Sequence, residues 1–477
     1  MAVTPKVSPA MFLLVLFMAL QLKLSAKLNC NFSGGLEDQI GLGAFLRYNY
    51  GVKRRRYVTF KIQEQSKDTG NARSSISELG NNHSPVEIPV RALGLLEDEA
   101  IRKKIARGPV FSARHERTHG SCPERARRCW PRSFCDASEE VGIYEIKRGN
   151  FSVKITNYGA TVISVILPDK NGKLGDVVLG FDSVDDYKND TTYFGAIVGR
   201  VANRIGGASF KLNGVEHKLT ANDHGNTLHG GIRGFSDVIW TVENYKKDSH
   251  LTLSYNSYDG EQGFPGNLSV TVTYTFVGKK RLRVRMKAKA LNKATPVNLA
   301  SHTYWNLGGH DSGDILSHNI QLFASKITPV NEKLIPTGAI EPVKGTAYDF
   351  LKPRAIGSEL NKLPGGYDIN YVLDDSDSSR HHLGKAAVVV DSKSGRKMQL
   401  WTNKPGVQFY TSNMLEDTKG KGGYVYKKHA ALCLETQGFP DSVNHPNFPS
   451  QIVKPGETYD HAMVYRFTIH EASHTDY

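Results

Sequence analysis

We predict an all-β fold, a large antiparallel β-sandwich, for residues 141–477 of this chain. Three observations predict it. Strand-length segments in which every second residue is apolar recur after residue 141, pairs of Asn and Gly separate several of them, and the 3.6-residue spacing of a long helix is absent. A region of this length can bury a substantial hydrophobic core.

The first 26 residues have the composition of a secretory signal peptide. Lys6 precedes a short apolar run at 11–20, and small residues follow at 25–26, whereas a membrane-spanning helix needs about 18 or more apolar residues in succession. We therefore expect a secreted protein with no integral membrane segment in the mature chain; a cytoplasmic location is the alternative. Potential glycan acceptors of an exported chain are Asn150, Asn189 and Asn267.

Residues 27–140 differ in composition from the rest of the chain. They contain basic clusters such as 53–56 and show no sustained strand or helix period, apart from one short helix expected at 93–107. We predict a basic extension of low order that is disordered over most of its length, and an insertion or an incorrectly assigned gene segment is our hypothesis for its origin. The cysteines of this region whose spacing fits no zinc site are Cys122, Cys129 and Cys135.

The net charge of +14 is unevenly distributed. Residues 1–140 carry 22 Lys and Arg against 14 Asp and Glu, whereas residues 141–477 carry 39 against 33. The larger region is thus only mildly basic and lacks the electrostatic footprint of a nucleic-acid-binding domain. We expect no nucleic-acid partner.

Turn pairs and alternating segments define the expected strands. Two Asn-Gly pairs predict two-residue hairpin turns, because Asn and Gly tolerate the positive φ that such turns require. They are Asn171-Gly172, between 162–167 and 177–179, and Asn213-Gly214, between 210–212 and 215–219. The strictest alternation, at 282–290, forms a long hairpin with 270–277 and has one buried face. Further strands are expected at 151–156, 250–255, 318–323, 386–391, 397–402, 407–411, 430–435 and 462–469.

One of these strands ends in a carboxylate. The apolar run 430–434 leads into Glu435, and Gly438 and Pro440 then interrupt the strand pattern. This places Glu435 at the end of a buried strand, where a carboxylate is either paired or functional. Cys433, inside the run, is interpreted as a small core residue.

Three other polar motifs lie in strand or turn sequence. Strand parity places His302 and Tyr304 on one side of their strand. Each motif also has a structural interpretation, since His229 or His302 can be a core histidine and Arg204 can pair with a surface acid. The motifs are Gly-Arg-Val-Ala-Asn-Arg-Ile at 199–205, Asn-Thr-Leu-His-Gly-Gly at 226–231 and His-Thr-Tyr-Trp-Asn-Leu at 302–307.

Taken together, these residue types indicate sugar chemistry. A neutral polyol requires Asn, Asp, Arg and His side chains for its hydroxyl groups and aromatic side chains such as Tyr304, Trp305 or Trp401 for its apolar face. The chain contains no Gly-rich phosphate loop, paired-Cys metal site, His-Glu-x-x-His helix or nucleophile elbow. We therefore expect acid/base catalysis with neither cofactor nor metal.

Two further motifs follow along the chain, Gly-Tyr-Asp-Ile-Asn-Tyr at 366–371 and Leu-Glu-Thr-Gln-Gly-Phe-Pro-Asp at 434–441. The five motifs in this order form a highly specific pattern. They closely resemble the aldose 1-epimerase (galactose mutarotase) family, in its plant-type form. The resemblance extends over about residues 141–469 and leaves 27–140 without a counterpart. It implies a large β-sandwich, often called a supersandwich, and therefore agrees with the strand pattern.

The resemblance also implies a mechanism that interconverts the α- and β-anomers of hexoses such as glucose and galactose. Glu435 resembles the general base that takes the proton of the C1 hydroxyl, and His302 resembles the general acid that protonates the ring oxygen. Glu435 must then be ionised and His302 protonated, a combination that opposite charges in one site favour. The other residues that resemble substrate-binding positions are Asn203, Arg204, His229, Tyr304, Asp368 and Gln408.

The expected partner is a small-molecule hexose, and we expect a monomer. A hexose-6-phosphate 1-epimerase is the nearest alternative, but it needs a basic cluster for the phosphate, and only Arg204 lies near the motifs. A non-catalytic sugar-binding β-sandwich is another, and it predicts a lost acid or base. A glycosidase is disfavoured because its two catalytic groups are both carboxylates.

Overall fold

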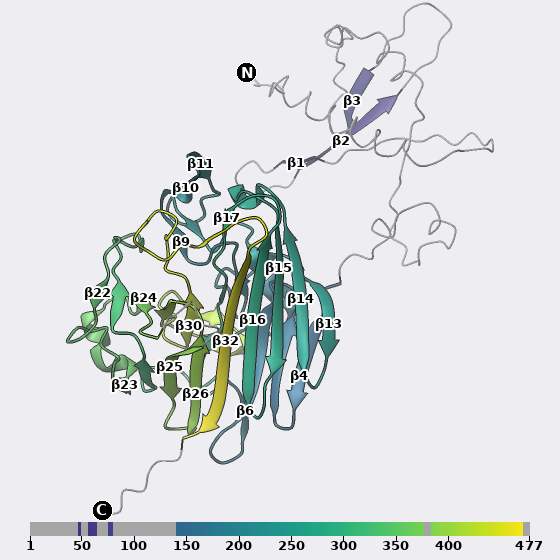
Figure 1. The fold of residues 1–477 in the computed structure, drawn as a ribbon. Helices are drawn as coiled ribbons and strands as arrows, with labels where there is room; N and C mark the ends of the chain where they lie inside the picture. Colours follow the sequence, from purple (N-terminus) through teal and green to yellow (C-terminus); the bar gives the residue numbers. More distant parts are fainter. Residues whose placement is uncertain (1–45, 49–55, 64–74, 80–139, 376–382, 471–477) are drawn as a thin grey trace, which may run out of the picture. The chain divides into compact units, whose positions relative to one another are not determined.

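Figure 1 shows the computed structural model, which describes residues 46–48, 56–63, 75–79, 140–375 and 383–470. Two compact units make up the chain, Met1–Asp136 and Ala137–Tyr477. The expected signal peptide, the expected helix at 93–107 and the cysteines Cys122, Cys129 and Cys135 lie outside the described residues.

The N-terminal unit contains one small antiparallel sheet that the sequence analysis did not predict. Its strands pair in the order β1-β2-β3, and their bounds are β1 Leu46–Tyr48, β2 Arg56–Gln63 and β3 Ser75–Leu79.

A nine-stranded antiparallel sheet is the largest element of the second unit (Figure 1). In sheet order its strands are β13 Thr241–Lys246, β14 His250–Ser257, β15 Leu268–Phe276, β16 Arg281–Ala290, β32 Thr458–Ile469, β26 Arg396–Thr402, β25 Gly384–Val390, β20 Asn319–Leu322 and β23 Arg354–Ala355. In β16 the buried residues alternate with exposed or half-buried ones, which confirms the predicted one-sided strand. Its hairpin with β15 is also confirmed.

Two further sheets and several short strand pairs complete this unit. The six-stranded sheet contains, in order, β19 Tyr304–Trp305, β30 Leu432–Gln437, β27 Gly406–Tyr410, β24 Asp368–Val372, β21 Lys326–Thr328 and β22 Glu341–Pro342. The four-stranded sheet contains β4 Ile143–Arg148, β5 Phe151–Thr156, β6 Thr161–Pro168 and β7 Leu174–Asp176. The pairs are β8 Ile197–Val198 with β18 Ala300–Ser301, β9 Arg204–Ile205 with β12 Thr227–Leu228, β10 Ser209–Leu212 with β11 Val215–Lys218, β17 Thr295–Pro296 with β31 Ile452–Val453, and β28 Thr418–Lys419 with β29 Val425–Tyr426.

Helices are few and short in the described part of the chain. They are α3 Val184–Tyr187 and the 3₁₀ turns Gly206–Ala208, Phe235–Asp237, Glu261–Gly263, Ile356–Lys362 and Lys421–Gly423. Among the described residues, none of these helices has the length and apolar character needed to cross a membrane.

One hydrophobic core unites the three large sheets. Side chains of the nine-stranded sheet, such as Val284 and Tyr465, pack in the same cluster as Val165 of β6 and as Phe409 and Leu434 of the six-stranded sheet. Apolar faces of separate sheets thus bury one another, as a sandwich requires. The predicted all-β sandwich is confirmed.

The two Asn-Gly pairs have different outcomes. At Asn213-Gly214 the flanking residues Leu212 and Val215 pair directly, so the two-residue turn is confirmed. The prediction of the same turn at Asn171-Gly172 is wrong, because the ladder ends where Pro168 pairs with Leu174. The intervening loop closes around the Asp169 carboxylate, which accepts hydrogen bonds from backbone N–H groups two and four residues later, at 2.8 and 2.9 Å.

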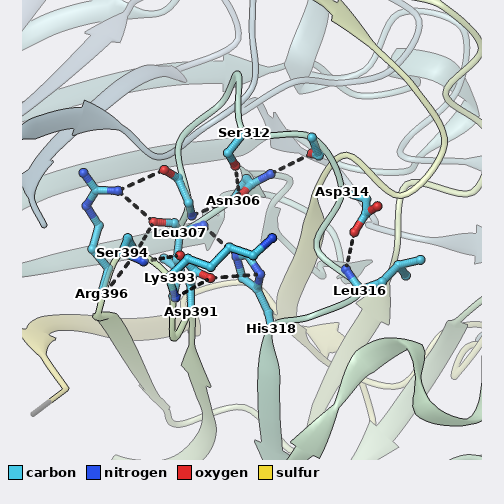
Figure 2. A network of polar contacts seen from close by, with 12 residues as sticks. Asn306, Leu307, Ser312, Asp314, Leu316, His318, Asp391, Lys393, Ser394 and Arg396 are labelled. Atoms are coloured by element: carbon cyan, nitrogen blue, oxygen red, sulfur yellow. Dashed lines mark hydrogen bonds and ion pairs between the residues drawn. The ribbon is translucent and has the colours of Figure 1, made fainter. Parts of the chain in front are cut away.

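A polar network holds the segment that follows β19 (Figure 2). The Asn306 amide donates to the carbonyl of Ala430, just before β30, at 2.9 Å. The Leu307 N–H donates to Nε2 of His318 at 3.1 Å, and the Leu307 carbonyl accepts from Nη1 of Arg396 at 2.9 Å. These bonds tie the segment after β19 to the residues just before β30 and to the start of β26.

Candidate active site

Alternate residues of β30 face opposite sides of the six-stranded sheet. Leu434 belongs to the main core, and the hydroxyl of Thr436 hydrogen-bonds Nε2 of His461 in β32 at 2.8 Å. Glu435 therefore faces the other side. The prediction that Glu435 ends its strand is wrong, because pairing with β27 continues as far as Gln437.

Cross-strand pairing brings polar side chains of three strands to this second face. Gln408 of β27 lies opposite Glu435, and Asn370 of β24 lies opposite Gln408. Asp368, two residues before Asn370, shares the face, and its Oδ1 accepts a hydrogen bond from Nε2 of Gln408 at 2.7 Å. The sheet thus assembles the predicted residues Glu435, Gln408 and Asp368 on one surface.

His302 lies in the connection between β18 and β19 and meets Glu435. Its Nε2 is 3.8 Å from Oε1 of Glu435, and both side chains are buried. The imidazole stacks on the ring of Tyr304, with centroids 5.1 Å apart, so the two residues lie on one side as strand parity predicts. The Tyr304 hydroxyl donates to the carbonyl of Thr192 at 2.9 Å, which holds this ring behind the imidazole.

The pairing of β9 with β12 positions a second histidine. The Asn203 backbone N–H donates to Nδ1 of His229 at 3.2 Å, and the His229 N–H donates to the Asn203 carbonyl at 3.1 Å. Since Nδ1 accepts this bond, a neutral His229 carries its proton on Nε2. The ring centroids of His229 and His302 are 5.1 Å apart. His229 can therefore donate a hydrogen bond to a ligand beside His302.

Arg204 brings a cation to the same site. Its Nε donates to Oδ2 of Asp223 at 2.7 Å, and both side chains are largely buried. Its charge lowers the pKa values of Glu435 and Asp368 against the raising effect of burial. Asp223 was not predicted as a site residue, although this acid comes shortly before the motif at 226–231 and matches the acidic partner considered for Arg204.

The part of the chain that contains this site matches known proteins. The aldose 1-epimerase family model matches residues 142–466. The chain belongs to the aldose 1-epimerase family. It is 43% identical to a galactose mutarotase from Bos taurus over 333 residues, covering 68% of this chain and 94% of the relative, and 33% identical to an aldose 1-epimerase from Escherichia coli K12 over 322 residues, covering 66% and 91%.

A solved structure supports the same assignment. A crystal structure of an aldose epimerase homologue from C. elegans superimposes with a TM-score of 0.65 at 29% identity, covering 70% of this chain and 100% of that one. The resemblance predicted from the five motifs is therefore confirmed at the level of the family.

Burial controls the charge states of Glu435 and His302 in this aldose 1-epimerase family member. Desolvation, with the nearby Asp368 charge, raises the pKa of Glu435 to about 8. Desolvation lowers the pKa of His302 to about 4. With no sugar bound, at neutral pH, these pKa values place the proton on Glu435 and leave the imidazole neutral. This differs from the expected ion pair, because desolvation is the largest influence on the pKa of each of these buried groups.

The three buried groups His229, His302 and Glu435 also have the composition of a metal site, with ligand atoms within 4.8 Å of one another. The His229 hydrogen bond argues against that use. Because Nδ1 accepts from the Asn203 N–H, Nε2 carries the proton and has no lone pair for a metal ion. The donor set therefore suits a hydrogen-bonded ligand better than a metal.

Two side chains that the sequence analysis did not assign to the site contact its histidines. The Tyr193 ring centroid lies 4.8 Å from that of His229 and 5.9 Å from that of His302. Cys433, a fully buried core residue as predicted, places Sγ 3.7 Å from Nδ1 of His302. Tyr193 has no distinguishing signal in the sequence, whereas strand parity relative to Glu435 indicates the side on which Cys433 lies.

Two of the three proposed aromatic walls pack elsewhere. Trp305 is buried in the main core, with its ring centroid 5.0 Å from that of Tyr465. Trp401 lies in β26 of the nine-stranded sheet, opposite Lys385. Strand alternation explains the difference for Trp305, because it follows Tyr304 directly and so faces the opposite side.

Proposed function

We propose that this chain interconverts the α- and β-anomers of hexoses such as glucose and galactose, with Glu435 as general base and His302 as general acid. The observation that carries the proposal is the buried approach of the His302 Nε2 to the Glu435 Oε1, at 3.8 Å, on a sheet face that also presents the polar side chains of Gln408 and Asp368. The family membership and the names of the relatives support the reaction.

Both catalytic groups have free hydrogen-bonding capacity. Their separation exceeds a normal hydrogen bond, and Oε2 of Glu435 has no partner among the residues that the structure describes. Glu435 can therefore accept the proton of the C1 hydroxyl, while His302 delivers a proton to the ring oxygen. These are the two oxygens bonded to C1, so one sugar can engage both groups.

The reaction then follows from two proton transfers. As Glu435 removes the hydroxyl proton, the C1–O bond of the ring breaks, its electron pair stays on the ring oxygen, and His302 protonates that oxygen. The product is the open-chain aldehyde. Rotation about C1–C2 presents the other face of the carbonyl, and reversal of both transfers closes the ring as the other anomer. Each positioned group typically contributes about 10²–10⁴-fold.

Polarimetry of freshly dissolved α-D-glucose and α-D-galactose tests the proposal directly. We expect the full chain to accelerate the decay of optical rotation toward the anomeric equilibrium for at least one of these sugars. Failure to accelerate either would refute the proposed reaction.

Arg204→Ala should raise KM more than it lowers kcat. The guanidinium, held by Asp223, is assigned to sugar hydroxyls and not to proton transfer. Losing a hydrogen bond from a charged donor costs about 1.5–3 kcal/mol, or roughly 10–100-fold in affinity. Initial rates at varied galactose concentration measure the effect, with Arg283→Ala on an exposed part of β16 as control. An unchanged KM would remove Arg204 from the binding site.

The pH dependence of kcat/KM should be bell-shaped. With the pKa of His302 near 4 and that of Glu435 near 8, the two groups of the free protein together hold one proton between about pH 4 and pH 8. The reactive form, with Glu435 ionised and His302 protonated, is a tautomer of this state, so its fraction follows the same bell.

Below the lower pKa the base is also protonated, and above the higher pKa the acid has no proton to give. We therefore expect kcat/KM to fall on both sides and stay level between them. Polarimetric rates in a buffer series of constant ionic strength check this. A kcat/KM that still climbs beyond the upper limb would contradict the assignment.

The hexose-6-phosphate alternative is less well supported. Among the eight predicted site residues Arg204 is the only Lys or Arg, and its charge is already paired with Asp223. The non-catalytic alternative requires a missing acid or base, but both His302 and Glu435 are present and adjacent.

A further inference from the structure

Two amide side chains with no assigned role lie on the same sheet face as the site. Gln437 follows Glu435 by two residues in β30, and Asn370 follows Asp368 by two residues in β24. Gln437 is 0% exposed and Asn370 1% exposed. Burying two amides so completely is costly unless their hydrogen bonds are satisfied.

The amides form a continuous chain of hydrogen bonds that ends on Asp368. Nε2 of Gln437 donates to Oδ1 of Asn370 at 3.2 Å and to Oε1 of Gln408 at 3.3 Å. Nε2 of Gln408 donates to Oδ1 of Asp368 at 2.7 Å. At the far end, Nδ2 of Asn370 donates to Oγ1 of Thr328 at 3.3 Å.

The carboxylate at one end determines the direction of every bond. An ionised Asp368 only accepts, so Gln408 must turn its NH₂ group toward it and its carbonyl oxygen toward Gln437. Gln437 must then present NH₂ to that oxygen and to the Asn370 oxygen. This arrangement leaves one acceptor unsatisfied, since Oε1 of Gln437 is buried with no hydrogen-bond partner among the described residues.

A glycine provides the space for these amides. Gly406 of β27 lies opposite Gln437, and a Cβ at this position would be 2.5 Å from Oδ1 of Asn370. Its φ is not positive, so its backbone conformation does not require glycine. Glycine within a strand weakens it and often marks a close approach of other groups. Here the group that approaches is the amide chain.

We propose that Gln437 and Asn370 are positioning residues that hold the Gln408 amide with its NH₂ group on Asp368, so that this half-buried carboxylate stays ionised to accept sugar hydroxyls. The inference rests on the proposed sugar-binding role of Asp368 and Gln408. Neither positioning residue touches the sugar. Both act through Gln408.

A matched pair of amide-to-carboxylate substitutions tests the proposal. Gln437→Glu replaces the central donor with an acceptor, so Gln408 is expected to turn its oxygen toward Asp368, and KM for galactose should rise about tenfold or more. Asn370→Asp also introduces a buried carboxylate nearby, but one of its oxygens still accepts from Gln437. The Thr328 hydroxyl can rotate to donate to the other carboxylate oxygen. Its KM should rise less than about threefold.

Gln437→Met keeps the length of the side chain but removes the hydrogen-bond donor. It serves as the test if the Gln437→Glu variant does not fold. We expect an intermediate rise in KM, with kcat changed less than KM. The control is Gln321→Met, which deletes an amide that donates to the Leu351 carbonyl at 3.0 Å in the nine-stranded sheet. It should leave KM unchanged.

Thermal unfolding of each variant confirms that it is folded before its kinetics are measured. Equal KM values for the Gln437→Glu and Asn370→Asp variants, or an unchanged KM for Gln437→Met, would overturn the proposal while wild-type activity still supports the epimerase function. An inactive wild-type protein would instead reject the function itself.

Discussion

Replacement of Glu435 by glutamine is expected to lower kcat by about 10²–10⁴-fold, the typical contribution of a positioned general base. Glutamine has nearly the same shape, so it keeps the contacts of the strand, but its amide cannot accept the proton of the C1 hydroxyl. The buried Oε2, which has no partner among the residues that the structure describes, is the atom that we expect to receive this proton. Polarimetry gives the rate, and calorimetric titration with galactose should still detect weak binding.

A matched substitution separates this effect from general damage. Glu216→Gln makes the same chemical change at an exposed position of β11 and should retain wild-type kinetics. Full activity of the Glu435→Gln variant would refute the base assignment. A loss of activity together with an unfolded circular dichroism spectrum would make the measurement uninformative, so the spectrum is recorded first.

Replacement of His302 by glutamine should cause a loss of similar size, about 10²–10⁴-fold in kcat. Glutamine can donate a hydrogen bond to the ring oxygen but cannot transfer a proton to it, so ring opening lacks its acid. His217→Gln, at a half-buried position of β11, is the control. If His302 were only a core histidine stacked on Tyr304, its replacement would lower the unfolding temperature and spare kcat.

The double variant distinguishes cooperating groups from independent ones. Glu435 and His302 act on the two oxygens of one carbon, so the loss of either stops the same step. We therefore expect the double variant to be about as slow as the slower single variant, because residues that act as a unit have strongly non-additive effects. A loss equal to the product of the single effects would mean that the two groups do not cooperate.

Much of the fold was predictable because strand alternation and turn chemistry are local properties. The alternation in β16 required only that one face be buried, and Asn213-Gly214 required only residues that tolerate positive φ. Asn171-Gly172 shows the limit of this reasoning. There the Asp169 carboxylate accepts hydrogen bonds from two backbone N–H groups, and this favours a wider loop over the two-residue turn. The Asn-Gly dipeptide alone does not reveal that alternative.

In the candidate site, too, local motifs were predictable and contacts between distant segments were not. His302 and Glu435 were identified from motifs far apart in the chain, and the structure brings them to 3.8 Å. The partner of Arg204 and the amide chain through Gln437 were missed. Hydrogen bonds of this kind join residues whose proximity depends on sheet order and register, which no short motif records.

The sequence by itself determined the alternating strands, the family motifs and the two candidates, Glu435 and His302, for base and acid. The tertiary structure decided where the proton resides: it raises the pKa of Glu435 to about 8 and lowers that of His302 to about 4. The physical reason is that the residue type sets the ordinary pKa of a group, whereas the removal of water around it depends on the three-dimensional packing of distant segments.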